Sequence, residues 1–211
     1  MAGESSMAVT GGGITVAGWN GRVDDKEAKS GMTISSAKFT DMAGGIHVTT
    51  GPAATYWNPA NVAKGSYTVR ATFNEPKYMN LNSHPHPYGV VVGGNDLGSD
   101  QQSYLYCAVN GNGSFIVRGM GPAAFALNGG RGETNAAVNK AAAKGEPVTN
   151  EVAVKVAGDK VECAINGKTV ASYDRSALVT AGRLKSTDGT YGLRFAHNTD
   201  VHVSGFSVTT P

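Results

Sequence analysis

The sequence predicts an all-β protein, a two-sheet antiparallel β-sandwich, and three observations predict it. Short runs that alternate apolar and polar residues recur from end to end of the 211 residues, with turn signals about every 8–12 residues. Glycine accounts for 29 residues, about twice its usual share of ~7%, and glycine at this density weakens helices. Helix-forming alanines gather only at 135–144, a segment too short for a helix that is stable on its own.

The expected strands cover residues 46–50, 66–73, 88–93, 104–109, 114–118, 151–156, 160–165, 168–173, 190–196 and 200–208. The run 66–73 alternates cleanly, whereas 88–93 is continuously apolar, as in a strand that is buried on both faces. Asn-Gly dipeptides follow 104–109 and 160–165. This pair is a strong hairpin signal, because the turn requires positive φ at both central residues.

The chain shows no linker with a core on each side, so one domain is expected. We expect residues 14–211 to form a single β-sandwich domain with a long surface loop around residues 120–150. Residues 1–13 lack the basic and apolar segments of a secretory signal. We expect them to be a flexible leader or the remnant of a fusion.

Charge and hydropathy exclude two classes of partner. Lys and Arg number 18 against 16 Asp and Glu, so the net charge of +2 gives no strong field to gather nucleic acid. No run of 18 apolar residues occurs, so no membrane insertion is expected. Small side chains and low charge leave room for a homo-oligomer.

The two cysteines, Cys107 and Cys163, stand in strand-like runs without the spacing of a zinc site. One interpretation is a pair of buried thiols that act as small apolar residues. The other is a disulfide between distant strands in an oxidising compartment. The residues leave both interpretations open.

Three segments carry a family resemblance. Residues 150–173 (NEVAVKVAGDKVECAINGKTVASY) resemble the strand, strand, NGK, strand signature of concanavalin A-like, laminin-G-like jelly rolls. The closing TDGTYGLRFAHNTDVHVSGFSV resembles the end of the bacterial domain of unknown function 1080, a family also labelled 3-keto-disaccharide hydrolase. The middle segment 84–119 looks like an exported, uncharacterised branch of the same superfamily.

The resemblance covers roughly residues 19–208 and implies a jelly-roll fold with a periplasmic or extracellular location. The superfamily includes lectins, carbohydrate-binding modules, glycosidases and adhesion modules, and fold alone does not decide among them. Jelly-roll glucanases place paired carboxylates on one strand face, in a Glu-x-Asp-x-x-Glu motif that this chain lacks. We therefore expect a secreted or periplasmic glycan-binding module without catalysis. The alternatives are a hydrolase acting on a modified glycoside and a structural or self-assembling surface protein.

The catalytic candidates are three histidines and one aspartate: His84, His86, His197 and Asp200. The prolines in HPHPY favour an extended backbone, in which residues i and i+2 face the same way. With His197 or Asp200, the His-x-His pair could hold zinc or another transition metal. The alternative is that histidines flanked by prolines shape a loop and hydrogen-bond the backbone.

The expected ligand-binding residues are Tyr88, Tyr104, Tyr106, Arg118, Arg194 and His197. Alternation puts Leu105, Cys107 and Val109 in the core and turns both neighbouring tyrosines outward, where aromatic rings can stack on sugars. The resemblance implies that Tyr88, Arg194 and His197 approach one surface. The alternative is that the tyrosines are ordinary strand formers.

The turn GGNDLGSDQQSY contains three oxygen-bearing residues, Asn95, Asp96 and Asp100. Calcium prefers such carboxylate and carbonyl ligands, so this turn is a candidate calcium site. Asn and Asp in turns also commonly hydrogen-bond their own backbone, which is the competing interpretation.

Overall fold

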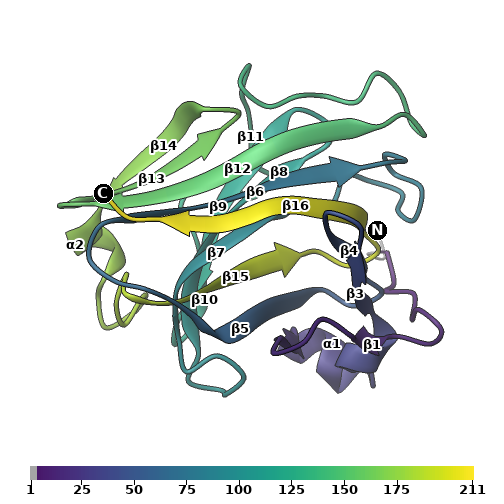
Figure 1. Cartoon of the computed structure of the whole chain (residues 1–211), viewed down its shortest axis with the longest axis horizontal. Helices are drawn as coiled ribbons and strands as arrows, with labels where there is room; N and C mark the ends of the chain where they lie inside the picture. Colours follow the sequence, from purple (N-terminus) through teal and green to yellow (C-terminus); the bar gives the residue numbers. More distant parts are fainter. Residues whose placement is uncertain (1–3) are drawn as a thin grey trace.

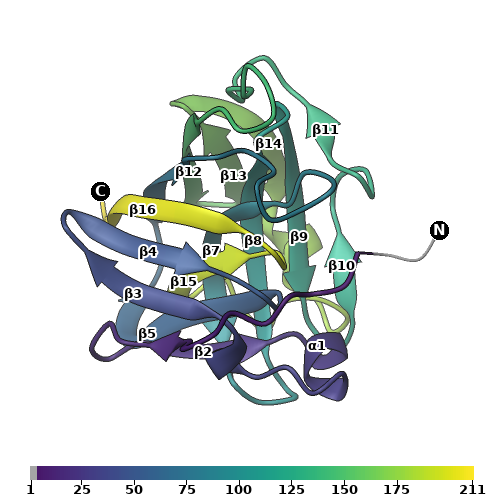
Figure 2. The same ribbon diagram turned by 90° about the vertical axis from the view of Figure 1, so that its right-hand side faces the viewer.

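Two curled β-sheets lie face to face in the computed structural model, which describes residues 4–211 (Figures 1 and 2). Sheet A runs in the order β1 (Gly13–Ile14), β3 (Lys38–Met42), β4 (Gly45–Thr49), β16 (Asp200–Thr209), β6 (Tyr67–Glu75), β12 (Val148–Ala157), β13 (Lys160–Ile165) and β14 (Lys168–Asp174). Sheet B runs in the order β10 (Ala124–Ala126), β9 (Ser114–Met120), β8 (Ser103–Asn110), β7 (Tyr88–Asn95), β15 (Gly189–Phe195), β5 (Ala54–Ala63) and β2 (Asn20–Val23), with β11 (Glu133–Thr134) on β9. The predicted antiparallel β-sandwich is confirmed, apart from the short parallel pair β1–β3.

In the part of the chain that the structure describes, helical structure is limited to α1 (Asp25–Lys29), the 3-10 turn η1 (Ile34–Ser36) and α2 (Arg175–Leu178). The alanine-rich segment 135–144 contains no helix. Within residues 4–211, no helix has the length and apolar character needed to cross a lipid bilayer.

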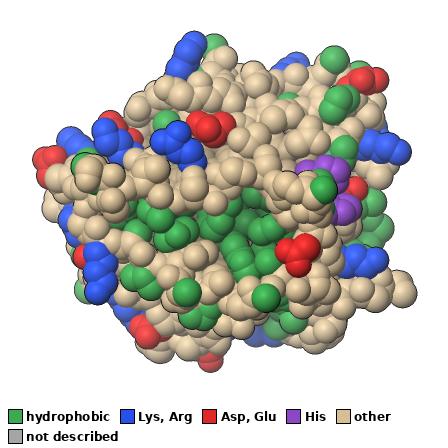
Figure 3. All heavy atoms as spheres, viewed as in Figure 1, with side chains coloured by type: hydrophobic (Ala, Val, Ile, Leu, Met, Phe, Trp, Pro, Cys, Tyr) green, Lys and Arg blue, Asp and Glu red, His purple; other side chains and the backbone are tan. Residues whose placement is uncertain are grey.

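The core lies between the sheets and follows the predicted alternation. On β6, Val69, Ala71 and Phe73 are fully buried, and Leu105 and Cys107 of β8 belong to the same core cluster from the other sheet. Strand β7 is buried along almost its whole length, as its continuous apolar run predicted. Apolar side chains also reach the surface in the hollow between β16 and the strands β15 and β5 (Figure 3).

A disulfide joins the two sheets. Cys107 on β8 and Cys163 on β13 are bonded, with Cα atoms 6.0 Å apart. Of the two interpretations that the sequence left open, the structure has the disulfide between distant strands and not the pair of free thiols. The bond ties the centre of sheet B to the far half of sheet A.

The segment predicted to be a free leader is in fact bound to the domain from residue 4 onward. The Met7 amide donates to the Asn198 side chain at 2.8 Å, and that side chain donates to Glu4 at 2.9 Å. Gly13 and Ile14 then pair with β3. Residues 1–3 lie outside the described residues.

Other regions also differ from the sequence expectation, among them β2 and β3, which precede the first expected strand. The 120–150 loop contains β10 and β11, two short strands that pair with β9. Strand β5 was not predicted, because Asn58 and Pro59 interrupt its apolar pattern. Pro59 is tolerated where β2 no longer pairs with β5, so its missing N–H breaks no ladder bond on that side.

We expect reduction of Cys107–Cys163 to lower the free energy of unfolding by about 2–4 kcal/mol, because the bond closes a long loop in the unfolded chain. Urea unfolding of the oxidised and the reduced wild-type chain measures this difference without creating a cavity. Equal midpoints for the two forms would contradict the prediction.

Candidate functional site

The outer face of sheet B is concave. The Thr55 hydroxyl on β5 donates to the Tyr104 hydroxyl on β8 at 3.3 Å, although β7 and β15 lie between these strands. Three strand spacings would separate the two strands by about 14 Å in a flat sheet. The contact therefore requires strong curvature towards the solvent side of sheet B.

Two glycines permit this curvature. A Cβ on Gly89 of β7 would lie 1.9 Å from the Cys107 carbonyl oxygen, and one on Gly192 of β15 would lie 2.2 Å from the Tyr56 carbonyl oxygen. No real side chain fits at either distance, so only glycine allows the neighbouring backbones to approach this closely.

The concave outer face of sheet B holds a pocket of about 350 Å³. It is lined by Asp24, Tyr104, Tyr106, Arg118, Gly119, Met120, Ala124, Phe125, Ala126 and Arg194. Four of the six residues predicted to bind a ligand thus meet at one place: both tyrosines of β8 and one arginine each from β9 and β15. The outward direction of the two tyrosines agrees with the alternation of β8, although only 2% of Tyr104 is exposed.

An ion pair organises one wall of the pocket. The Arg194 guanidinium donates to both carboxylate oxygens of Asp24, at 2.6 and 2.5 Å, and to the Thr55 hydroxyl at 3.2 Å. Burial by itself lowers the pKa of Arg194, but the Asp24 carboxylate raises it well above its ordinary value. The guanidinium therefore stays charged, and its carbon lies 5.6 Å from the centre of the Tyr106 ring.

Arg118 on the opposite wall keeps free donor capacity. Its register partner on β8 is Tyr106, and its Nη2 donates to the Gly130 carbonyl. Its Nε is buried without a hydrogen-bond partner among residues 4–211. A buried donor without a partner is costly, so an acceptor from a ligand or from water is expected here.

Tyr88 does not belong to the pocket. It pairs with Phe195, whereas Arg194 pairs with the adjacent Gly89, so Tyr88 and Arg194 point to opposite faces of sheet B. Tyr88 is fully buried in the core, and its hydroxyl donates to Glu75 at 3.1 Å. The family resemblance predicted a shared surface, but the two-residue period of the strand excludes it.

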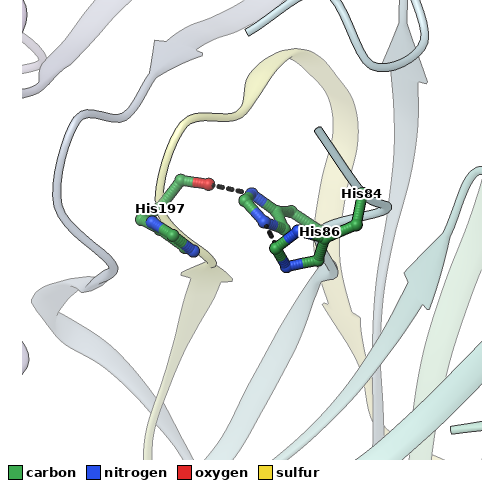
Figure 4. Close-up of side chains that lie close together, drawn as sticks. All are labelled: His84, His86 and His197. Carbon is green, nitrogen blue, oxygen red and sulfur yellow. Dashed lines mark hydrogen bonds between the residues drawn. The ribbon is translucent and has the colours of Figure 1, made fainter. Parts of the chain in front are cut away.

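The predicted histidines form a separate cluster at the end of β15 (Figure 4). His84 and His86 come from the β6–β7 connection and His197 follows β15, and one ring nitrogen of each lies within 4.8 Å of the others. Burial lowers the pKa of His86 to about 4 and also lowers the pKa of His197. None of these three histidines lines the pocket on sheet B. His197 therefore lies outside that pocket, contrary to the ligand set predicted from the sequence.

Asp200 is not part of this cluster. It begins β16, and its carboxylate lies 2.6 Å from Nε2 of His47 in sheet A. A carboxylate so engaged cannot join His84 and His86 as the sequence had suggested.

The three calcium candidates contact different partners. Asp96 pairs with Lys185 at 2.6 Å, Asp100 pairs with Arg22 at 2.7 Å, and the Asn95 amide donates to two backbone carbonyls. Calcium binding at this turn stays a prediction from the sequence.

Sequence reasoning missed Asp24, Thr55 and Phe125 in this region. Asp24 is 170 residues from Arg194 along the chain, and no local pattern marks its role. A buried arginine needs an acid partner. An arginine within an apolar strand, such as Arg194, is thus the signal in the sequence that an acid such as Asp24 lies nearby.

The comparisons with known proteins support the fold. No family model and no curated protein sequence matches this chain, so the likeness to domain of unknown function 1080 stays a resemblance. Among solved structures, the chain is similar to a carbohydrate-binding module, CBM66, from Bacillus subtilis, with TM-score 0.60 and 7% identity over 94% of this chain and 99% of that chain. It is also similar to a protein of unknown function with a galectin-like fold from Bacillus subtilis, with TM-score 0.61 and 11% identity over 97% and 93% of the two chains.

An endo-β-1,3-glucanase from Pyrococcus furiosus is similar as well, with TM-score 0.54 and 10% identity over 96% of this chain and 92% of that chain. These identities are low, so the likeness is one of fold. The predicted jelly-roll sandwich is confirmed.

We expect Asp24→Asn to lower the free energy of unfolding by roughly 1–3 kcal/mol, because it leaves the buried Arg194 charge with weaker acceptors. Asp24 is about one-third exposed, which favours the lower half of this range. Urea unfolding measures the change, and Asp41→Asn on the exposed end of β3 is the matched control. Equal stabilities of the two variants would contradict the role of the pair.

A second prediction concerns Glu75, the partner of Tyr88. Burial raises the pKa of Glu75 above 4.5, although hydrogen bonds from Met79 and Tyr88 partly oppose it. Above pH 4.5 the unfolded state releases this proton before the folded state does, so stability falls as pH rises towards the raised pKa. Glu75→Gln has no carboxyl group to titrate, so we expect the variant to lack this fall in stability. The free energy of unfolding of the variant relative to wild type should therefore increase with pH.

Urea unfolding between about pH 4 and pH 8 tests this prediction. Glu151→Gln, at a less buried position on β12, is the control and should show no such trend. A pH-independent difference between Glu75→Gln and wild type would refute it.

Proposed function

We propose that this protein is a secreted glycan-binding module without catalysis, and that its ligand lies in the concave-face pocket of sheet B. One observation carries the proposal: Tyr104, Tyr106, Arg118 and Arg194 line a single hollow in which one buried arginine nitrogen lacks a partner. The similarity to the fold of a carbohydrate-binding module supports it.

The chemistry of the pocket suits a sugar. The half-buried Tyr106 offers a ring for the apolar face of a pyranose, and the arginines offer donors for hydroxyl oxygens. A volume of about 350 Å³ is at the lower end for small-ligand sites, so a terminal sugar or a short oligosaccharide is the expected ligand.

The acid content of the pocket supports binding without hydrolysis. Glycosidases of the common type need two carboxyl groups that flank the scissile bond. Asp24 is the one acid among the lining residues that the structure describes, and Arg194 holds both of its oxygens. The Cys107–Cys163 disulfide supports secretion, because such bonds persist in oxidising compartments.

A glycan array with neutral and acidic oligosaccharides tests the proposal, followed by calorimetry on the best ligand. We expect Tyr106→Ala and Arg118→Ala each to weaken binding by roughly tenfold or more, equal to about 1.4 kcal/mol. Tyr173→Ala on β14 of sheet A is the control and should bind as wild type does. An array without any ligand, or unchanged affinity in both pocket variants, would contradict the proposal.

A further inference from the structure

We propose that His84, His86 and His197 form a binding site for one first-row transition ion of the Zn²⁺ type. The site is separate from the concave-face pocket, since none of the three histidines lines that pocket. The proposal goes beyond glycan binding and does not depend on it.

The three rings converge from two segments that are far apart in the sequence (Figure 4). Nε2 of His84 lies 3.0 Å from Nε2 of His86, and the His86 and His197 rings stack with their centres 4.2 Å apart. Ligands about 2.0–2.1 Å from a tetrahedral zinc have nitrogen atoms about 3.3 Å apart. One ring nitrogen of each residue lies within 4.8 Å of the others, so an ion that binds here has to draw the rings slightly closer together.

The hydrogen bond of His86 fixes its tautomer. Its Nδ1 contacts the His197 carbonyl oxygen, which can only accept, so Nδ1 carries the hydrogen. The lone pair of neutral His86 is therefore on Nε2, the atom that faces His84. Only 3% of the His86 side chain is exposed, so this arrangement is rigid.

His197 is oriented in the same way through Ser6. The Ser6 hydroxyl gives its hydrogen to Glu27 at 2.7 Å, and its oxygen lies 3.3 Å from Nδ1 of His197. Because its one hydrogen is used, Ser6 accepts from Nδ1–H, which leaves the lone pair of His197 on Nε2.

His84 follows the same rule through Glu4. Its Nδ1 lies 3.4 Å from a Glu4 carboxylate oxygen and from the Ser83 hydroxyl, which itself donates to Glu4 at 2.6 Å. Each Nδ1 thus lies near an oxygen acceptor, and when Nδ1 carries the hydrogen, each Nε2 has a free lone pair. Metal-binding histidines show this arrangement, in which an outer carbonyl or carboxylate orients each ligand.

The geometry also explains why an ion belongs here. With Nδ1–H tautomers on both residues, the Nε2 lone pairs face each other at 3.0 Å and repel, whereas an Nε2–H tautomer of His84 makes the same contact a hydrogen bond to His86. A proton can serve two nitrogen atoms, but a third lone pair favours a metal ion. Imidazole nitrogen is a ligand for zinc, copper, nickel and iron rather than calcium or magnesium, and the half-exposed His84 leaves a fourth position for water.

Calorimetric titration of the full chain, produced without a polyhistidine tag, with ZnCl₂ tests the proposal. We expect one ion per chain and a rise in melting temperature of about 5–10 °C at a hundredfold excess over Kd. His84→Ala and His86→Ala should weaken binding by roughly tenfold or more, and Ser6→Ala, which removes an outer acceptor, by roughly 10–100-fold.

Two features keep the test decisive. More than half of the His84 side chain is exposed, so His84→Ala is expected to fold even if the buried His86 does not tolerate replacement. His202→Ala removes a histidine from the outer face of sheet A, where His202 packs against His47, and should bind zinc as wild type does. The absence of stoichiometric binding, unchanged affinity in His84→Ala, or an equal loss in His202→Ala would overturn the proposal.

Discussion

The curvature of sheet B is the constraint on which the rest of the structure depends. Its inner face must cover sheet A, and its outer face curls until Thr55 and Tyr104 meet across two intervening strands. Gly89 and Gly192 make this possible, because any side chain there would strike a neighbouring carbonyl. The hollow that results is deep enough to bury aromatic and charged side chains together, which a flat sheet face does not do.

The two arginines of this pocket differ in their partners. Arg194 is neutralised by Asp24 and held rigidly between Thr55 and Tyr106, so it acts as a structural element of the wall. Arg118 forms no ion pair among residues 4–211 and retains a buried donor without a partner. The pocket therefore combines a rigid side with a side that still has hydrogen-bonding capacity, which is a useful combination for selecting a polar ligand. The histidine cluster is built differently, since each ring is oriented by its own oxygen acceptor.

Much of the fold was predictable because strands have a local period of two. The alternation around Cys107 correctly put Leu105 inside and both neighbouring tyrosines outside, and it made the cross-sheet disulfide one of two open interpretations. The prolines around His84 and His86 indicated that these rings could lie together, as they do. Strand β5 does not follow from the sequence, because Pro59 breaks its pattern. The resemblance implies the wrong face for Tyr88, because the two-residue period of β7 turns this side chain into the core.

By itself, the sequence determined most of the long strands, the turns between them and the face on which most side chains lie, because these follow from neighbours one or two residues apart. Only the tertiary structure decided which distant groups meet: Asp24 with Arg194, Cys107 with Cys163, and Ser6 with His197. It also separated Asp200 from the histidines, by placing it beside His47 on sheet A. These pairings depend on strand order and sheet curvature, which arise from packing over the whole chain and leave no mark in any short segment.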